Sequence, residues 1–168
     1  MRTSLAALAL VLAAPAVAAD DLSGWNNDTL GGGTSWVLDA GNQSVVQRVN
    51  GLPTIFYNPA IDAINYSVRA DVQTLTTVDD DFFGFVFGYD GGDLFSNAAD
   101  YLLIDWKQAE QSRGVPGLAV SRVRGQDSVT TPGSAFLAHD NNVVSEIARA
   151  ANLGNTGWAD LVNYTFDI

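Results

Sequence analysis

The sequence predicts an all-β protein whose antiparallel strands form a sandwich. Apolar and polar residues alternate between residues 65 and 73, so that one face of a strand holds Tyr66, Val68, Ala70 and Val72. A strongly aromatic segment, residues 82–89, has the length and composition of a second strand. Clusters of Gly, Asn, Asp and Pro separate these and other short apolar runs at regular spacing. A strand with one apolar and one polar face is typical of an antiparallel sheet.

The first 19 residues have the features of a secretory signal peptide. Arg2 precedes an apolar run from Leu5 to Val17, and small residues at 16–19 suit cleavage. The alternative is an N-terminal membrane anchor, which needs about 20 apolar residues. We therefore expect residues 1–19 to be removed and residues 20–168 to form one domain. This domain would be secreted, periplasmic or on the cell surface, without membrane insertion of the mature chain.

Three short strands are expected after the polar, glycine-rich lead-in: residues 36–38, 45–49 and 54–57. Pro53 and Pro59 bracket the third of these, which favours an edge position because proline cannot donate to a ladder. Residues 65–75, 82–89 and 100–109 are then expected to form adjacent antiparallel strands, since the connection from 90 to 99 is short. Residues 142–152 contain good helix formers. The last five residues, from Tyr164, have the pattern of a strand.

The aromatic segment has one bulky face and one nearly bare face. Phe83, Phe85, Phe87 and Tyr89 share one side of the strand. A sugar-stacking platform is one interpretation, but an aromatic face on a central strand favours a sandwich core. Trp106 and Trp158 are likewise expected to pack inside and to find one hydrogen-bond partner each. For Lys107, the only lysine, we expect a surface ion pair of little energetic weight.

The charge of the chain restricts the kinds of partner. The formal charge is −11, and loss of Arg2 with the signal peptide makes it about −12. Such a charge repels phosphate backbones and anionic bilayers, so nucleic acid is excluded as a natural partner. It attracts cations instead. Cysteine is absent, so an exported chain of this size would depend on its apolar core or on a metal ion.

Three clusters of aspartates are candidates for calcium binding: Asp79, Asp80 and Asp81, then Asp90 and Asp93, and then Asp140. Ca²⁺ takes six to eight oxygen ligands, and 17 of the 19 acidic residues are Asp rather than Glu. Asp81 and Asp90 bracket a strand about 30 Å long, too long for both ends to bind one ion. The alternative for all three clusters is that the aspartates are solvated turn residues.

Four ordered motifs resemble the lectin-like C-terminal domain of the thrombospondins. They are the acidic and aromatic run 77–89 followed by Tyr101–Gln108, then Gly117–Val120, then Phe136–His139, and lastly Asn155–Asp160 followed by Tyr164. The resemblance covers residues 77 to 164, and upstream only the strand pattern and general character agree. It implies a calcium-binding, concanavalin-like jelly-roll sandwich and a strand, not a helix, over residues 142–152. It also implies a fragment whose C-terminal strands and any C-terminal anchor are missing; the alternative is a shorter natural variant that closes its sandwich differently.

The resemblance implies a non-catalytic module for adhesion or for recognition of carbohydrate, matrix or surface proteins. The basic Arg-Phe-Tyr stretch tied to receptor binding in the thrombospondins is replaced here by Asp100-Tyr101-Leu102, which argues against the animal receptor function. The first alternative is a glycan-active enzyme of the same architecture, but Glu110 and Glu146 stand apart and no paired-carboxylate run is present. Near His139, the sole histidine, no serine has the sequence context of a nucleophile. The second alternative is a structural secreted protein without a specific ligand.

Overall fold

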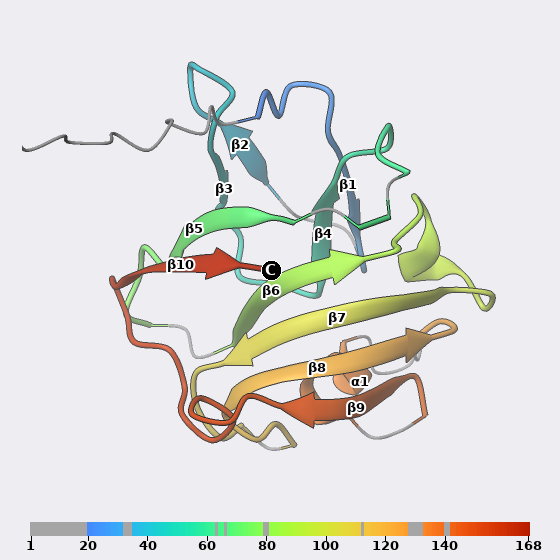
Figure 1. Ribbon diagram of the computed structural model, residues 1–168, viewed down its shortest axis with the longest axis vertical. Helices are drawn as coiled ribbons and strands as arrows, with labels where there is room; N and C mark the ends of the chain where they lie inside the picture. The colour runs from blue at the N-terminus through green and yellow to red at the C-terminus, as the bar shows by residue number, and fades with distance from the viewer. Residues whose placement is uncertain are drawn as a thin grey trace, which may run out of the picture.

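The computed structural model describes residues 20–31, 35–62, 64–65, 67–78, 81–111, 113–127, 133–139 and 142–168. Figure 1 shows an all-β chain in which every pairing between strands is antiparallel. The strands are β1 (Asn26–Thr29), β2 (Trp36–Leu38), β3 (Val45–Gln47), β4 (Thr54–Tyr57), β5 (Arg69–Gln73), β6 (Phe82–Phe87), β7 (Asp100–Lys107), β8 (Gly117–Arg124), β9 (Val144–Arg149) and β10 (Asn163–Asp167). The remaining elements are a 3₁₀ turn, η1 (Asp93–Phe95), and one short helix, α1 (Ser134–Ala138).

The largest sheet is a meander in the order β6-β7-β8-β9. Phe82 lies opposite Lys107 at one end of the β6–β7 pair, and Phe87 lies opposite Leu102 at the other. The pairing of β8 with β9 shifts register between Val120 and Ser121, where β9 has one extra residue. Three two-stranded sheets, β1-β4, β2-β3 and β10-β5, complete the open antiparallel architecture, which is that of a sandwich and confirms the predicted fold class.

The predicted pairing of the strand at residues 65–75 with the strand at residues 82–89 is wrong. This strand, β5, pairs with β10 and not with β6. Its apolar residues Ala70 and Val72 lie opposite Phe166 and Tyr164, so the two strands together present one apolar face. That face covers the aromatic side chains of β6 as a second layer, because rings from both layers are in contact. Alternation specified the strand and its buried face, but not its partner.

Other strand predictions are confirmed with small changes in their bounds. Residues 54–57 form β4, at the edge of a two-stranded sheet. Residues 144–149 form β9, where the strand implied by the family resemblance prevails over local helix propensity. The sequence did not predict β1, because Asn and Asp are depleted in strands.

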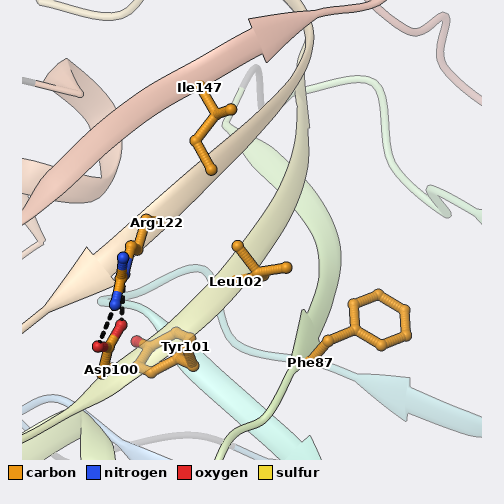
Figure 2. Close-up of a pocket in the computed structure, with 6 residues that line it drawn as sticks. All are labelled: Phe87, Asp100, Tyr101, Leu102, Arg122 and Ile147. Carbon is orange, nitrogen blue, oxygen red and sulfur yellow. Dashed lines mark hydrogen bonds and ion pairs between the residues drawn. The ribbon is translucent and has the colours of Figure 1, made fainter. Parts of the chain in front are cut away.

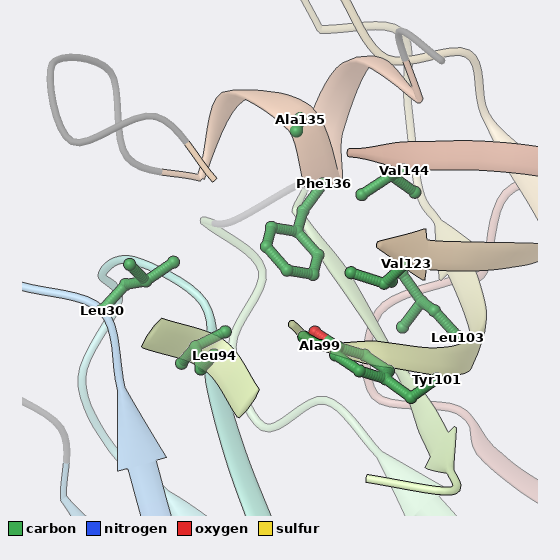
Figure 3. Packing of buried hydrophobic residues seen from close by; sticks show 9 residues of the cluster. All are labelled: Leu30, Leu94, Ala99, Tyr101, Leu103, Val123, Ala135, Phe136 and Val144. Atoms are coloured by element: carbon green, nitrogen blue, oxygen red, sulfur yellow. The ribbon is translucent and has the colours of Figure 1, made fainter. Parts of the chain in front are cut away.

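Part of the hydrophobic core lies between the main sheet and α1. Phe136 of α1 points toward Val123 and Leu103 of the sheet (Figure 3). Leu94 of η1 and Leu30 after β1 belong to the same buried cluster. The five residues of α1 are too few to be stable alone, so burial of Phe136 is what holds this turn of helix in place.

Aromatic rings fill the opposite side of the main sheet, beneath β10. Phe166 lies 5.0 Å from Phe85 and 6.1 Å from Phe83, measured between ring centroids. Trp106 packs against Tyr164 at 4.7 Å, and its indole donates to the Thr156 carbonyl at 2.7 Å. Packing of Phe83, Phe85 and Trp106 inside the sandwich is therefore confirmed, whereas Phe87 lines an open depression. Trp158 is buried as predicted, but its indole nitrogen has no hydrogen-bond partner among the described residues.

A separate aromatic stack lies near the N-terminus. Phe56 of β4 is sandwiched between Trp25 and Trp36, with centroid separations of 5.5 and 5.4 Å and nearly parallel planes. The Trp36 indole also donates to Thr54 Oγ1 at 2.8 Å. This stack joins the β1-β4 and β2-β3 sheets.

Candidate functional site

The structure describes three of the six aspartates predicted to bind calcium. Asp79, Asp80 and Asp140 lie outside the described residues. Asp81 stands directly before β6, where its carboxylate accepts a hydrogen bond from Gln111 Nε2 at 3.2 Å. Asp90 and Asp93 follow the other end of β6, so the structure separates them from Asp81 by the length of the strand.

The loop after β6 is held by carboxylates. Asp93 Oδ2 accepts the Asp90 amide at 3.0 Å, within the loop itself. Asp28, at the end of β1, reaches across and accepts both the Tyr89 hydroxyl at 2.6 Å and the Gly92 amide at 2.7 Å. Burial, followed by the hydrogen bond to Asp28, raises the pKa of Tyr89, so this phenol stays a donor. The sequence does not associate Asp28 with this loop, because 61 positions separate it from Tyr89.

These carboxylates accept hydrogen bonds that hold the loop in place, and they are not arranged as a group of metal ligands. Among the described residues no three acidic or histidine side chains form a group that could hold a metal ion. Asp28 and Asp93 already accept hydrogen bonds from the loop. The described carboxylates therefore do not make a complete calcium site by themselves.

A cluster of charged side chains is buried on the α1 side of the main sheet. Lys107 forms an ion pair with Asp105 on the same strand, and their side chains are 4% and 0% exposed. The prediction of a weak surface pair for Lys107 is thus wrong, because residues two apart on a strand share a face and this face is covered. Burial lowers the pKa of Lys107, and Asp105 opposes this by favouring the charged form.

His139 completes this cluster from the end of α1. It caps the helix in a left-handed conformation, with φ of 47°. Its Nε2 lies 2.8 Å from Lys107 Nζ and 3.2 Å from Asp105 Oδ1. Its Nδ1 lies 3.4 Å from both Ser121 Oγ and Glu146 Oε2.

The outer part of the cluster joins β9 to neighbouring loops. Arg149 donates from Nε and Nη2 to the Glu146 carboxylate at 2.9 and 2.8 Å, and from Nη1 to the carbonyls of Pro116 and Gly154. Burial opposes ionisation of Glu146, but the hydrogen bonds from Arg149 and His139 outweigh it and lower the pKa. A cavity of about 430 Å³ opens beside the cluster, and its lining consists of Lys107, Val115, Leu137, Ala138, His139, Glu146 and Arg149.

Ser121, His139 and Asp105 are connected in the order of a hydrolytic triad. No sequence context associates a serine with His139, and it is the pairing of β7 with β8 that places Ser121 near the imidazole. Ser121 and Asp105 are both fully buried. The contacts tie α1 to the sheet, but Asp105 Oδ1 accepts no hydrogen bond among the described residues.

A second, apolar depression lies on the opposite face of the main sheet, beyond the area that β10 covers. Figure 2 shows its lining of Phe87, Leu102 and Ile147 beside the ion pair of Asp100 with Arg122. The Leu102 and Ile147 side chains are exposed there. The charge of Asp100 is thus compensated by Arg122 of the neighbouring strand.

Comparison with known proteins supports the resemblance seen in the sequence. The chain is 26% identical to thrombospondin-3b of Danio rerio over 145 residues, which cover 80% of this chain and 15% of that protein. It is 28% identical to cartilage oligomeric matrix protein of Homo sapiens over 144 residues, covering 77% of this chain and 18% of that protein. With thrombospondin-4 of Bos taurus the identity is 27% over 141 residues, covering 77% and 14%.

The chain thus spans less than a fifth of the length of these curated relatives. The predicted resemblance to the thrombospondin C-terminal domain is confirmed. No family model matches the chain. No solved structure matches it either. In the part of the chain that the structure describes, no helix has the length and apolar character needed to cross a membrane.

Proposed function

We propose that this thrombospondin C-terminal-like chain is an exported, non-catalytic β-sandwich module that binds Ca²⁺ and recognises extracellular carbohydrate or a matrix or cell-surface protein. The observation behind the proposal is the similarity to thrombospondins and cartilage oligomeric matrix protein over 77–80% of the chain. The antiparallel sandwich agrees with it. So does the strongly acidic composition, which favours cations over nucleic acid or anionic lipid.

The buried cluster supports a structural role for His139 over a catalytic one. Its histidine contacts Asp105, Lys107, Ser121 and Glu146 at once, and the first three of these are at most 4% exposed. A catalytic histidine needs a nucleophile or a proton within reach of substrate. Here the groups neutralise and hydrogen-bond one another, as expected of a structural network.

For calcium we propose the segment Asp79–Asp81 as the principal binding region, with Asp90, Asp93 and Asp140 as further candidate ligands. Three consecutive carboxylates before a strand repel one another, and a divalent ion would remove that repulsion. Because Asp90 and Asp93 already order their own loop, we expect them to contribute less than the triplet.

The test is calcium titration of the folded protein by calorimetry, together with its melting temperature. Millimolar Ca²⁺ acting on a site of micromolar affinity would add about 4 kcal/mol to the free energy of unfolding by mass action. The double variant Asp80→Asn and Asp81→Asn should lose most of that gain, whereas Asp20→Asn, an exposed residue of the lead-in, should keep it.

Sodium chloride at matched ionic strength separates binding from screening, since it lowers repulsion without filling a multidentate site. Equal stabilisation by sodium chloride, or no heat of Ca²⁺ binding, would show that the aspartates are solvated turn residues. In that case the proposed recognition function would not involve a bound metal ion.

A further inference from the structure

The outer edge of β6 has backbone N–H and C=O groups that are not paired with any strand of the described residues. The Gln108 amide donates to the Asp81 carbonyl at 3.3 Å, which fixes Asp81 and Gln108 as a hydrogen-bonded pair. By alternation along the ladder, Phe83, Phe85 and Phe87 then bond to β7, and Phe82, Gly84 and Val86 direct their N–H and C=O groups away from it. Within the described part of the chain no strand pairs with that side of β6.

The two edges of the main sheet differ in their protection. At the other edge, β9 has a bulge and the charged residues Glu146 and Arg149, which are devices that block addition of a further strand. β6 has a regular register, no charged residue and no proline. Its central Gly84 is exposed and has no side chain to shield the backbone.

The charges at the ends of β6 indicate what kind of strand would fit. Asp81 precedes β6, directly after Asp79 and Asp80 in the sequence, and Asp90 and Asp93 follow it together with the inserted Asp28 carboxylate. A second copy of the chain, paired at this edge in either direction, would place acidic ends beside acidic ends. An added strand with basic residues at both ends would meet opposite charge instead.

We propose that the free edge of β6 binds an extended peptide segment of a partner protein, with β-branched residues at its centre and Lys or Arg at both ends, as an added antiparallel or parallel strand. Backbone hydrogen bonds at Phe82, Gly84 and Val86 supply the affinity, and the terminal carboxylates supply the selectivity. The inference rests on the proposed recognition of an extracellular protein, but not on the binding of Ca²⁺.

The probe is the synthetic peptide acetyl-Lys-Lys-Val-Thr-Val-Thr-Val-Lys-Lys-amide, titrated into the full chain in EDTA at low ionic strength. EDTA removes Ca²⁺, so peptide binding is measured independently of the calcium proposal. Binding or failure to bind therefore says nothing about whether a calcium site exists. The same peptide with glutamates at its ends should bind about tenfold more weakly, the sum of a few exposed charge pairs. A version N-methylated at every valine and threonine keeps the charge but has lost its central donors, and it should not bind.

Amide hydrogen exchange measured by NMR identifies the binding surface. In the free protein the amides of Phe82, Gly84 and Val86 should exchange much faster than those of Phe83, Phe85 and Phe87. The peptide should slow the first set severalfold and leave the second unchanged, so the strand contains its own control.

Equal binding of the N-methylated peptide, or binding without protection of Phe82, Gly84 and Val86, would overturn the proposal. So would a dimer of the free protein, seen by sedimentation, in which those three amides are already protected. In that case the occupant of the edge would be a second copy of the chain.

Discussion

Lys107, the single lysine of this protein, is buried because another element covers its face of the sheet. This burial changes what its ion pair contributes to stability. Residues two apart on a strand share a face, so Asp105 and Lys107 lie on the same side of β7. The sequence does not reveal that α1 and His139 cover that face. On the surface this ion pair would contribute little to stability. Because it is buried, stability requires both of its charges. Removing one partner would leave the other charge buried and uncompensated.

We therefore expect Lys107→Met to reduce the free energy of unfolding by about 3 to 5 kcal/mol. The double variant Asp105→Asn with Lys107→Met should recover much of the stability, because no charge then stays unpaired. Urea denaturation followed by circular dichroism measures all three proteins.

The control is Arg122→Met, which removes the exposed partner of Asp100. It should destabilise far less than Lys107→Met, since solvent screens the Asp100 charge. Equal losses in the two single variants would mean that burial of the Lys107 pair has no energetic consequence.

At the scale of the elements, local pattern predicted where strands lie but not what they pair with. Alternation and aromatic content located β5, β6 and β7, and the short connection between the last two made their pairing predictable. The pairing of β5 with β10 joins residues far apart in the chain, and no local signal specifies it. The helix α1 was missed because its five residues depend on burial of Phe136 and not on helix propensity.

The close approach of β6 to β7 depends on Gly84. A Cβ at this position would lie 1.9 Å from the Ile104 carbonyl oxygen, a backbone atom that cannot move alone. Gly84→Ala should therefore cost about 1 to 3 kcal/mol of stability, as overpacking does elsewhere. At Gly24 no atom lies within 4 Å of the added carbon, so Gly24→Ala is the matched control.

Thermal unfolding of the two alanine variants distinguishes the effects. The Gly84 variant should melt several degrees lower, and the Gly24 variant should stay close to the parent protein. A Gly84 variant with unchanged melting temperature would show that β6 can shift away from β7 at no cost.

On the scale of the whole molecule, the sandwich depends on contacts between its layers that a single sequence only suggests. The chain's aromatic content indicated a packed interior, but not that Phe166 would lie against both Phe83 and Phe85. The candidate site was equally incomplete: aspartate clusters are visible in the sequence, whereas the Asp28 contact and the His139 cluster form only when distant strands come together. The predicted calcium ligands remain predictions.

Phe166→Ala should loosen the two layers from each other. We expect a loss of about 3 kcal/mol, at the lower end for truncating a packed phenylalanine because this ring is only partly buried. Asn163→Ala, an exposed change on the same strand, should have little effect. Guanidinium denaturation measures both, and equal stability of the two variants would place the main contact between the layers elsewhere.

The placement of the four tryptophans has an optical consequence. Trp106 and Trp158 are buried in the aromatic layer beneath β10, whereas Trp25 and Trp36 flank Phe56 in the N-terminal stack. Replacing either pair by phenylalanine leaves an intrinsic fluorophore that reports on one region alone. The unfolding of these two regions can then be followed separately by emission, without attaching a dye.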